Sequence, residues 1–177
     1  MSKTRIYIVE DETLIAMEIS DRLMHLGYEV CGKAARGEQA LEEIPLVRPD
    51  IVLMDICLAG ELNGIDTAAK LRQPLDVPVV FLSAFSDDAL LKEALGTEPF
   101  GYLVKPFEER ELHATLQAAL YRHRMERQRI HSRKLENQLQ IAGSISHEFN
   151  NLLQVIMGHL TLARTALQSD DRHIAGN

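Results

Sequence analysis

The feature that most restricts the fold of this 177-residue chain is a short apolar run, Ile51–Asp55, which ends in a carboxylate. The run is too short for a helix and precedes turn-forming residues, a pattern typical of a buried strand in a parallel sheet. In open α/β sheets, ligands bind beside the carboxyl ends of the strands. We therefore predict that Asp55 is a nucleophile, with an ordinary turn-initiating aspartate as the alternative.

Two further strand-like runs bring charged residues to the same expected edge. The first run of the chain is followed by Glu10 and Asp11, and the last is followed by Lys105. Three carboxylates, including Asp55, would repel one another beside a single ammonium group unless a divalent cation joined them. Because such oxygen ligands suit Mg²⁺, the charge balance predicts a Mg²⁺ site.

Strand-like and helix-like patterns alternate over the first two thirds of the chain. Strands are expected at residues 5–9, 28–34, 51–55, 77–82 and 101–104. Helices are expected at residues 13–26, 37–44, 63–71 and 86–95, and from residue 108 onward. The second helix should close before Pro45, and Gly27 should end the first. This alternation predicts an α/β fold with a parallel sheet covered by helices on both faces.

A set of residues at these strand ends resembles the receiver domain of bacterial two-component response regulators. The matching residues, in family order and near family spacing, are Glu10, Asp11, Asp55, Ser83, Tyr102, Lys105 and Pro106. The resemblance covers residues 1–121. It implies a flavodoxin-like (βα)5 fold with strand order 2-1-3-4-5.

The resemblance also implies roles for the charged residues. Asp55 would accept a phosphoryl group, while Asp11 would bind Mg²⁺ directly and Glu10 would bind it through water. An Asp55 oxygen and the backbone carbonyl of Cys57 would be further ligands. Lys105 would place a positive charge beside the phosphoryl group.

Two residues would act as a switch, and two positions depart from the family pattern. Ser83 would hydrogen-bond the phosphoryl group and Tyr102 would swing inward. The acidic pair is Glu-Asp instead of the commoner Asp-Asp, and residues 59–61 lack the proline often found after the phosphoacceptor loop. The second departure leaves the conformation of that loop open. The expected phosphodonor is a histidine kinase or a phosphotransfer protein.

The remainder of the chain has a helical pattern. After Pro106 there is no further proline, and apolar residues recur in steps of three and four between Leu135 and Leu167. This heptad-like seam predicts a long C-terminal helix that forms a dimeric coiled coil, with Gly143 and Ser144 as a candidate hinge.

The tail also contains a candidate functional motif, Ser146-His147-Glu148-Phe149-Asn150-Asn151. It resembles the H-box of histidine-kinase dimerisation helices. The resemblance implies that His147 accepts a phosphoryl group, that Glu148 tunes it as a base, and that Asn151 positions water. A solvent-facing histidine on a coiled coil is the alternative. A His-Glu-x-x-His zinc motif is excluded because its fifth position is Asn151.

These patterns predict three segments and a phosphorelay function. Residues 1–121 form a receiver, residues 122–142 a helical linker or coiled coil, and residues 143–177 a partial dimerisation and histidine-phosphotransfer helix. Because no ATP-binding motif is found, we expect a fragment of a receiver-linked histidine kinase or a short protein that keeps only the phosphoacceptor helix. An alternative is a stand-alone response regulator whose helix serves only dimerisation.

Two other functional classes fit the sequence less well. A phosphohydrolase of the haloacid-dehalogenase type needs Asp-x-Asp, but here Asp55 is followed by Ile56 and Cys57. A DNA-binding regulator is suggested by basic residues after residue 121, yet acidic residues are mixed among them. We therefore expect no nucleic-acid partner.

Composition sets the remaining bounds. Residues 1–121 carry 11 Lys/Arg and 21 Asp/Glu, a net charge of −10, whereas residues 122–177 carry 8 and 5, a net charge of +3. This asymmetry supports a boundary near residue 121. No apolar run reaches the length of a membrane span, and the two cysteines form no framework, so a cytoplasmic protein is expected.

Overall fold

The computed structural model describes residues 3–72, 75–84, 99–134 and 157. Its core is one five-stranded parallel sheet in the order β2-β1-β3-β4-β5. The strands are β1 (Arg5–Val9), β2 (Glu29–Ala34), β3 (Ile51–Asp55), β4 (Val79–Ala84) and β5 (Gly101–Lys105). The helices are α1 (Thr13–His25), α2 (Gly37–Val47), α3 (Gly64–Arg72) and a C-terminal helix over residues 109–134. The predicted flavodoxin-like fold, its strand order and its long C-terminal helix are confirmed; the predicted helix at residues 86–95 lies outside the described residues.

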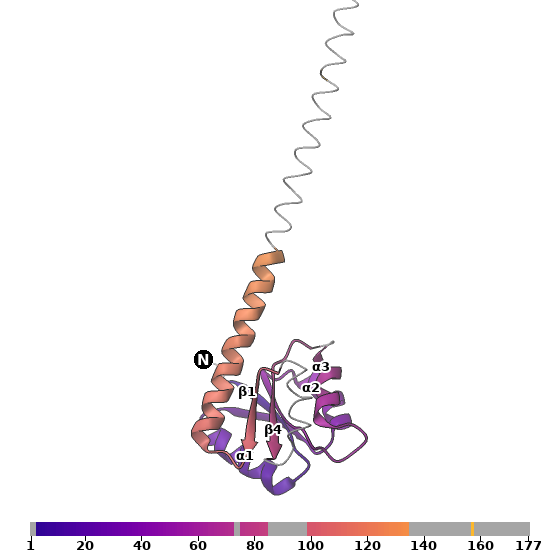
Figure 1. Cartoon of the computed structure of the whole chain (residues 1–177), viewed down its shortest axis with the longest axis vertical. Coiled ribbons are helices and arrows are strands. Elements are labelled where there is room, and N and C mark those ends of the chain that lie inside the picture. The colour runs from indigo at the N-terminus through magenta and orange to yellow at the C-terminus, as the bar shows by residue number, and fades with distance from the viewer. Residues whose placement is uncertain (1–2, 73–74, 85–98, 135–156, 158–177) are drawn as a thin grey trace, which may run out of the picture. The chain divides into compact units, whose positions relative to one another are not determined.

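The sheet separates two apolar layers because successive strand residues point to opposite faces. Ile8 and Leu53 pack with α1 and the C-terminal helix, whereas Val9 and Met54 pack with α2 and α3. Figure 1 shows α2 and α3 together on one side of the sheet. All five residues of β3 are buried, as expected for a central strand covered on both faces.

The prediction that the second helix closes before Pro45 is wrong. The α2 helix runs through Pro45 to Val47, and Arg48 caps it in the left-handed conformation. Proline near the end of a helix removes only one backbone hydrogen bond, and the next turn is kept by the Arg48 N–H, which donates to Ile44 O at 2.8 Å. The side chain of Arg5 also donates to the carbonyls of Val47 and Arg48, which fixes this turn from outside the helix.

Several element boundaries shift by one or two residues. The fourth strand runs from Val79 to Ala84 and not over residues 77–82, because its pairing with β5 continues to the last residue of both strands. Ser83 therefore lies inside β4. Lys105 likewise belongs to β5, where it pairs with Ala84.

The chain divides into two compact units, Met1–Arg127 and Gln128–Asn177. Within the first unit, the C-terminal helix is tied to the amino-terminal edge of the sheet, because the Asp76 carboxylate pairs with His123 at 2.9 Å and with Arg127 at 3.0 Å. In the described part of the chain, no helix is both long enough and apolar enough to cross a membrane. The predicted H-box and the candidate hinge at Gly143 and Ser144 lie entirely outside the described residues, and so does the predicted seam between Leu135 and Leu167 apart from position 157.

Candidate functional site

The site is an acidic cluster at the carboxyl edge of the sheet. Glu10 and Asp11 directly follow β1, and Asp55 ends β3, which is hydrogen-bonded to β1. The side chains of these three residues each bring a carboxylate oxygen within 4.8 Å of the other two. The parallel arrangement of neighbouring strands thus brings together residues that are 44 positions apart in the sequence, as predicted.

Lys105 joins this cluster from the end of β5. Its ammonium donates to Glu10 Oε2 at 2.6 Å and also forms an ion pair with Asp55 Oδ2. The Lys105 side chain is 16% exposed and that of Glu10 is fully buried. The four charged residues that we expected at the strand ends therefore form one partly buried network.

Burial dominates the electrostatics of Glu10. Removal from water raises the pKa of Glu10 to about 7, and the Asp55 charge adds to this effect, while the hydrogen bond from Lys105 opposes it. For Lys105, burial favours the neutral amine, but the hydrogen bonds and charges of Asp55 and Glu10 outweigh it. The pKa of Lys105 is consequently raised.

The cluster has the donor set of a hard divalent cation. Glu10 Oε1 is buried and has no hydrogen-bond partner among the described residues. An unsatisfied buried carboxylate oxygen is costly, and a cation that it coordinates would remove this cost. Oxygen donors from three carboxylates fit Mg²⁺.

The loop after β3 holds the backbone around Asp55 in a fixed conformation. The Cys57 N–H donates to Asp55 Oδ1 at 2.9 Å, and the Gly64 N–H donates to Ile56 O at 2.9 Å. At Gly64 a Cβ atom would lie only 1.9 Å from the backbone oxygen of Asp55, so no larger residue fits there without movement of the backbone. Asn63 caps α3 through a 2.7 Å hydrogen bond from the Asp66 N–H.

The two predicted switch residues lie on adjacent strands. Ser83 is buried, and its hydroxyl donates to Ala84 O at 3.0 Å, while Tyr102 is 46% exposed. Within the described ranges, neither side chain forms a hydrogen bond with the acidic cluster. Their role as a switch remains a prediction, as does that of the Cys57 carbonyl.

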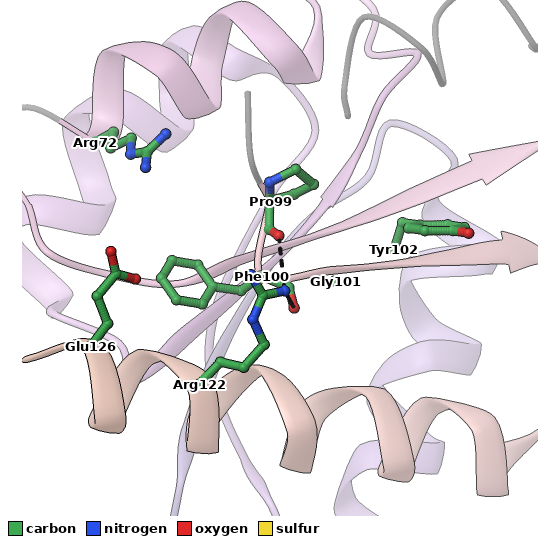
Figure 2. A pocket seen from close by; sticks show the side chains of 7 residues that line it. All are labelled: Arg72, Pro99, Phe100, Gly101, Tyr102, Arg122 and Glu126. Atoms are coloured by element: carbon green, nitrogen blue, oxygen red, sulfur yellow. Dashed lines mark hydrogen bonds between the residues drawn. The ribbon is translucent and has the colours of Figure 1, made fainter. Parts of the chain in front are cut away.

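A separate cavity of about 520 Å³ is lined in part by Tyr102 and by residues of the C-terminal helix. It is lined by Arg72, Pro99, Phe100, Gly101, Tyr102, Arg122 and Glu126 (Figure 2). The Arg122 guanidinium lies 5.7 Å from the centre of the Phe100 ring and donates to the Phe100 carbonyl at 3.3 Å. Tyr102 and the C-terminal helix therefore share one solvent-accessible space, which contains none of the four clustered residues.

His147, Glu148 and Asn151 are outside the described residues, and their roles remain predictions.

Sequence reasoning missed two residues that contact the backbone of segment 55–64. Glu38, in the first turn of α2, accepts hydrogen bonds from the backbone N–H groups of Glu61 and Leu62 at 3.1 and 3.0 Å. Gly64 contacts the backbone of Asp55. Neither contact has a local sequence signal, since Glu38 is 23 positions from Glu61 and a close backbone approach is visible only in three dimensions.

The fold and the site together define a class of protein. A flavodoxin-like sheet with an aspartate, an acidic pair and a lysine at its carboxyl edge is the arrangement that the receiver resemblance predicts. Residues 6–117 match the family described as the response regulator receiver domain. The chain belongs to this family.

Individual relatives agree with this family. The transcriptional regulatory protein PdtaR of Mycobacterium tuberculosis is 38% identical over 120 residues, which are 68% of this chain and 58% of PdtaR. The chemotaxis protein CheY of Thermotoga maritima is 34% identical over 105 residues, covering 59% of this chain and 87% of CheY. The chain thus spans little more than half the length of PdtaR.

A solved structure gives the same result. The signal receiver domain of a modulated diguanylate cyclase from Desulfovibrio desulfuricans G20 matches with a TM-score of 0.67 and 37% identity. The match covers 71% of this chain and 99% of the other.

Proposed function

We propose that this protein is a phosphorelay receiver in which Asp55 accepts a phosphoryl group with the help of Mg²⁺. The observation that carries this proposal is the convergence of three carboxylates and one lysine at the carboxyl edge of the sheet. A nucleophilic carboxylate beside a cation site is the arrangement that acyl-phosphate formation requires. The relatives include a transcriptional regulatory protein and a chemotaxis protein, which agrees with a signalling role.

The reaction would form one bond and break another. An Asp55 carboxylate oxygen forms a bond to the phosphorus of the donor, and the bond from that phosphorus to its leaving group breaks. The ammonium of Lys105, already in contact with Asp55, offsets the negative charge of the transferring oxygens. Bound Mg²⁺, held by Asp11, Asp55 and the Cys57 carbonyl with Glu10 in support, would neutralise the carboxylates and the phosphoryl oxygens.

The phosphodonor would be a histidine kinase or a phosphotransfer protein. The receiver resemblance implies such a partner, and small acyl phosphates are a chemical substitute for it. The protein can therefore be tested without its partner.

The test is phosphoryl uptake from acetyl phosphate in the presence of Mg²⁺, followed by intact-mass spectrometry. Wild-type protein should gain one phosphoryl group with release of acetate, and Asp55→Asn should gain none. Asp21→Asn, which removes an exposed carboxylate from α1, is the matched control and should behave as wild type. Equal uptake by wild type and Asp55→Asn would reject Asp55 as the acceptor.

The proposal extends to the C-terminal helix. Tyr121, Met125 and Ile130 are 62%, 40% and 60% exposed on this helix, so they leave apolar surface that a second chain could cover. We propose that this helix mediates homodimerisation and passes the phosphorylation state of the receiver to the H-box helix that carries His147. In the alternative, this is a stand-alone response regulator whose helix serves only dimerisation.

A further inference from the structure

The loop between Asp55 and α3 has attachments at its start, its middle and its end. At its start the Cys57 N–H donates to the Asp55 carboxylate, and at its end the Gly64 N–H donates to Ile56 O. Between these points the backbone N–H groups of Glu61 and Leu62 both donate to one oxygen of Glu38. Of these three attachments, the one to Glu38 comes from outside the segment 55–64.

The conformation of the loop matches this attachment. Gly60 has a φ of +132°, which side-chain-bearing residues rarely adopt, and a Cβ there would lie 3.0 Å from Glu38 Oε2. The backbone therefore passes directly over the Glu38 carboxylate. A carboxylate is suited to this position because it only accepts hydrogen bonds and can take two N–H groups at once.

The first turn of α2, which carries Glu38, is itself fixed by packing. A Cβ at Gly37 would lie 2.1 Å from Thr67 Oγ1 and 3.2 Å from Leu62 Cβ, so the first turn of α2 is in close contact with α3 and the loop. Thr67 is fully buried and donates to Asn63 O at 2.7 Å. The start of α2 and the start of α3 therefore form one packed unit around the loop.

The ionised state of Glu38 is favoured locally. Its own backbone N–H and those of Leu62 and Glu61 lower the pKa of the Glu38 carboxyl, in opposition to partial desolvation. Near neutral pH the side chain is a carboxylate.

We propose that Glu38 is a positioning residue, which fixes the loop after β3 and thereby holds the Cys57 backbone in place to bind Mg²⁺. This inference rests on the proposed function, because it deepens the account of the same cation site. Loss of Glu38 leaves two loop N–H groups to water and frees the middle of the loop. The backbone at Glu61 and Leu62 then loses the support that the first turn of α2 gives it, and the segment that leads back to Cys57 gains freedom.

The experiment compares Glu38→Ala, Glu38→Gln and Glu42→Ala by ¹H–¹⁵N NMR at a temperature well below unfolding. Glu42 is exposed on the same helix, so Glu42→Ala controls for the loss of one negative charge. In metal-free protein, Glu38→Ala should increase amide exchange at Glu61 and Leu62. Mg²⁺ titration of the same samples should show roughly tenfold weaker binding in Glu38→Ala, because the variant must order the loop when the ion binds. A tenfold change corresponds to about the contribution of one hydrogen bond to a charged group.

The conservative variant separates positioning from charge. Glu38→Gln keeps a carbonyl oxygen that accepts an N–H, so its exchange rates and Mg²⁺ affinity should lie between those of wild type and Glu38→Ala. If Glu38→Ala shows the same amide exchange or the same Mg²⁺ affinity as wild type, the positioning role is overturned. The proposed function stays intact in that case if wild-type protein takes up a phosphoryl group. Equal weakening in Glu42→Ala would overturn it too, because the effect would then be one of net charge. If wild-type protein neither binds Mg²⁺ nor takes up a phosphoryl group, the proposed function fails and the positioning role fails with it.

Discussion

Replacement of Gly64 by alanine is the sharpest test of how the backbone positions Asp55. The added Cβ would lie 1.9 Å from the Asp55 carbonyl oxygen, 2.9 Å from the Asp55 carbonyl carbon and 3.0 Å from Ile56 Cα. All three atoms belong to the backbone, so no side chain can rotate away. To restore an ordinary contact, Asp55 and Gly64 must separate by roughly 1.5 Å, which is a large movement in a close-packed interior.

Two effects of this movement can be measured. Overpacking of this kind costs about 1–3 kcal/mol of unfolding free energy, which should lower the midpoint of thermal unfolding by roughly 5–10 °C. A reacting group displaced by about 1 Å loses on the order of 100-fold in rate. Gly64→Ala should therefore take up phosphoryl groups from acetyl phosphate about 100-fold more slowly than wild type.

The assay is a time course of intact mass below the unfolding midpoints of all proteins compared. Gly27→Ala is the matched control: Gly27 has a φ of +86°, but a Cβ added there would meet no atom within 4 Å beyond its chain neighbours in the described structure. That variant should lose about 1–2 kcal/mol from backbone strain and keep the wild-type rate of uptake. Gly64→Ala that is folded, destabilised and phosphorylated at the wild-type rate would refute the argument that the Gly64 contact positions Asp55.

Three other predictions follow from single features of the chain. Tyr7 is fully buried, and burial together with the Glu43 carboxylate raises the pKa of its phenol, so above pH 10 the unfolded state loses this proton before the folded state does and the free energy of unfolding falls. In denaturant unfolding, a rise from about pH 8 to about pH 10.5 should lower the free energy of unfolding of wild type by about 0.8 kcal/mol more than that of Tyr7→Phe. The same pH dependence in both proteins would contradict this. Light scattering should give a dimer for the full chain and a monomer for a chain that ends at Tyr121; a monomeric full chain would exclude the proposed seam. Incubation with ATP and Mg²⁺ alone should leave His147 unmodified by phosphopeptide mass spectrometry, since the sequence offers no ATP-binding motif, and phosphorylation there would show that one was missed.

The strand ends were predictable from the sequence because each is a local event. An apolar run that stops at a charged residue marks a strand and its final side chain together, as at Asp55 and Lys105. Parallel pairing then brings these ends to one edge, so the cluster follows from the fold class together with the strand order that the receiver resemblance implies. The alternation of strands and helices identifies that class without any long-range information.

The details around Asp55 could not be predicted in this way. The hydrogen bonds from the loop to Glu38 join segments that the sequence separates, and the close approach at Gly64 depends on the angle at which α3 leaves the loop. The course of α2 through Pro45 was also missed. Proline is a strong local signal for a helix end, but Arg5 on β1 binds the carbonyls that follow and supports the additional turn.

The attachment of the C-terminal helix bears on how a signal from Asp55 could leave the receiver. The helix begins four residues after Lys105, at the same edge of the sheet as the acidic cluster, and its later turns contact the opposite edge through Asp76. Asp76 is 67% exposed in its side chain, and exposed ion pairs of this type contribute only about 0–1 kcal/mol each. A difference of about 1.4 kcal/mol shifts a two-state equilibrium tenfold. The start of the helix is held far more firmly, because Leu112, Leu116 and Ala119 are fully buried in the core. We therefore expect a small displacement at the Lys105 end to change the Asp76 ion pairs of the later turns more readily than the packing of the first turns.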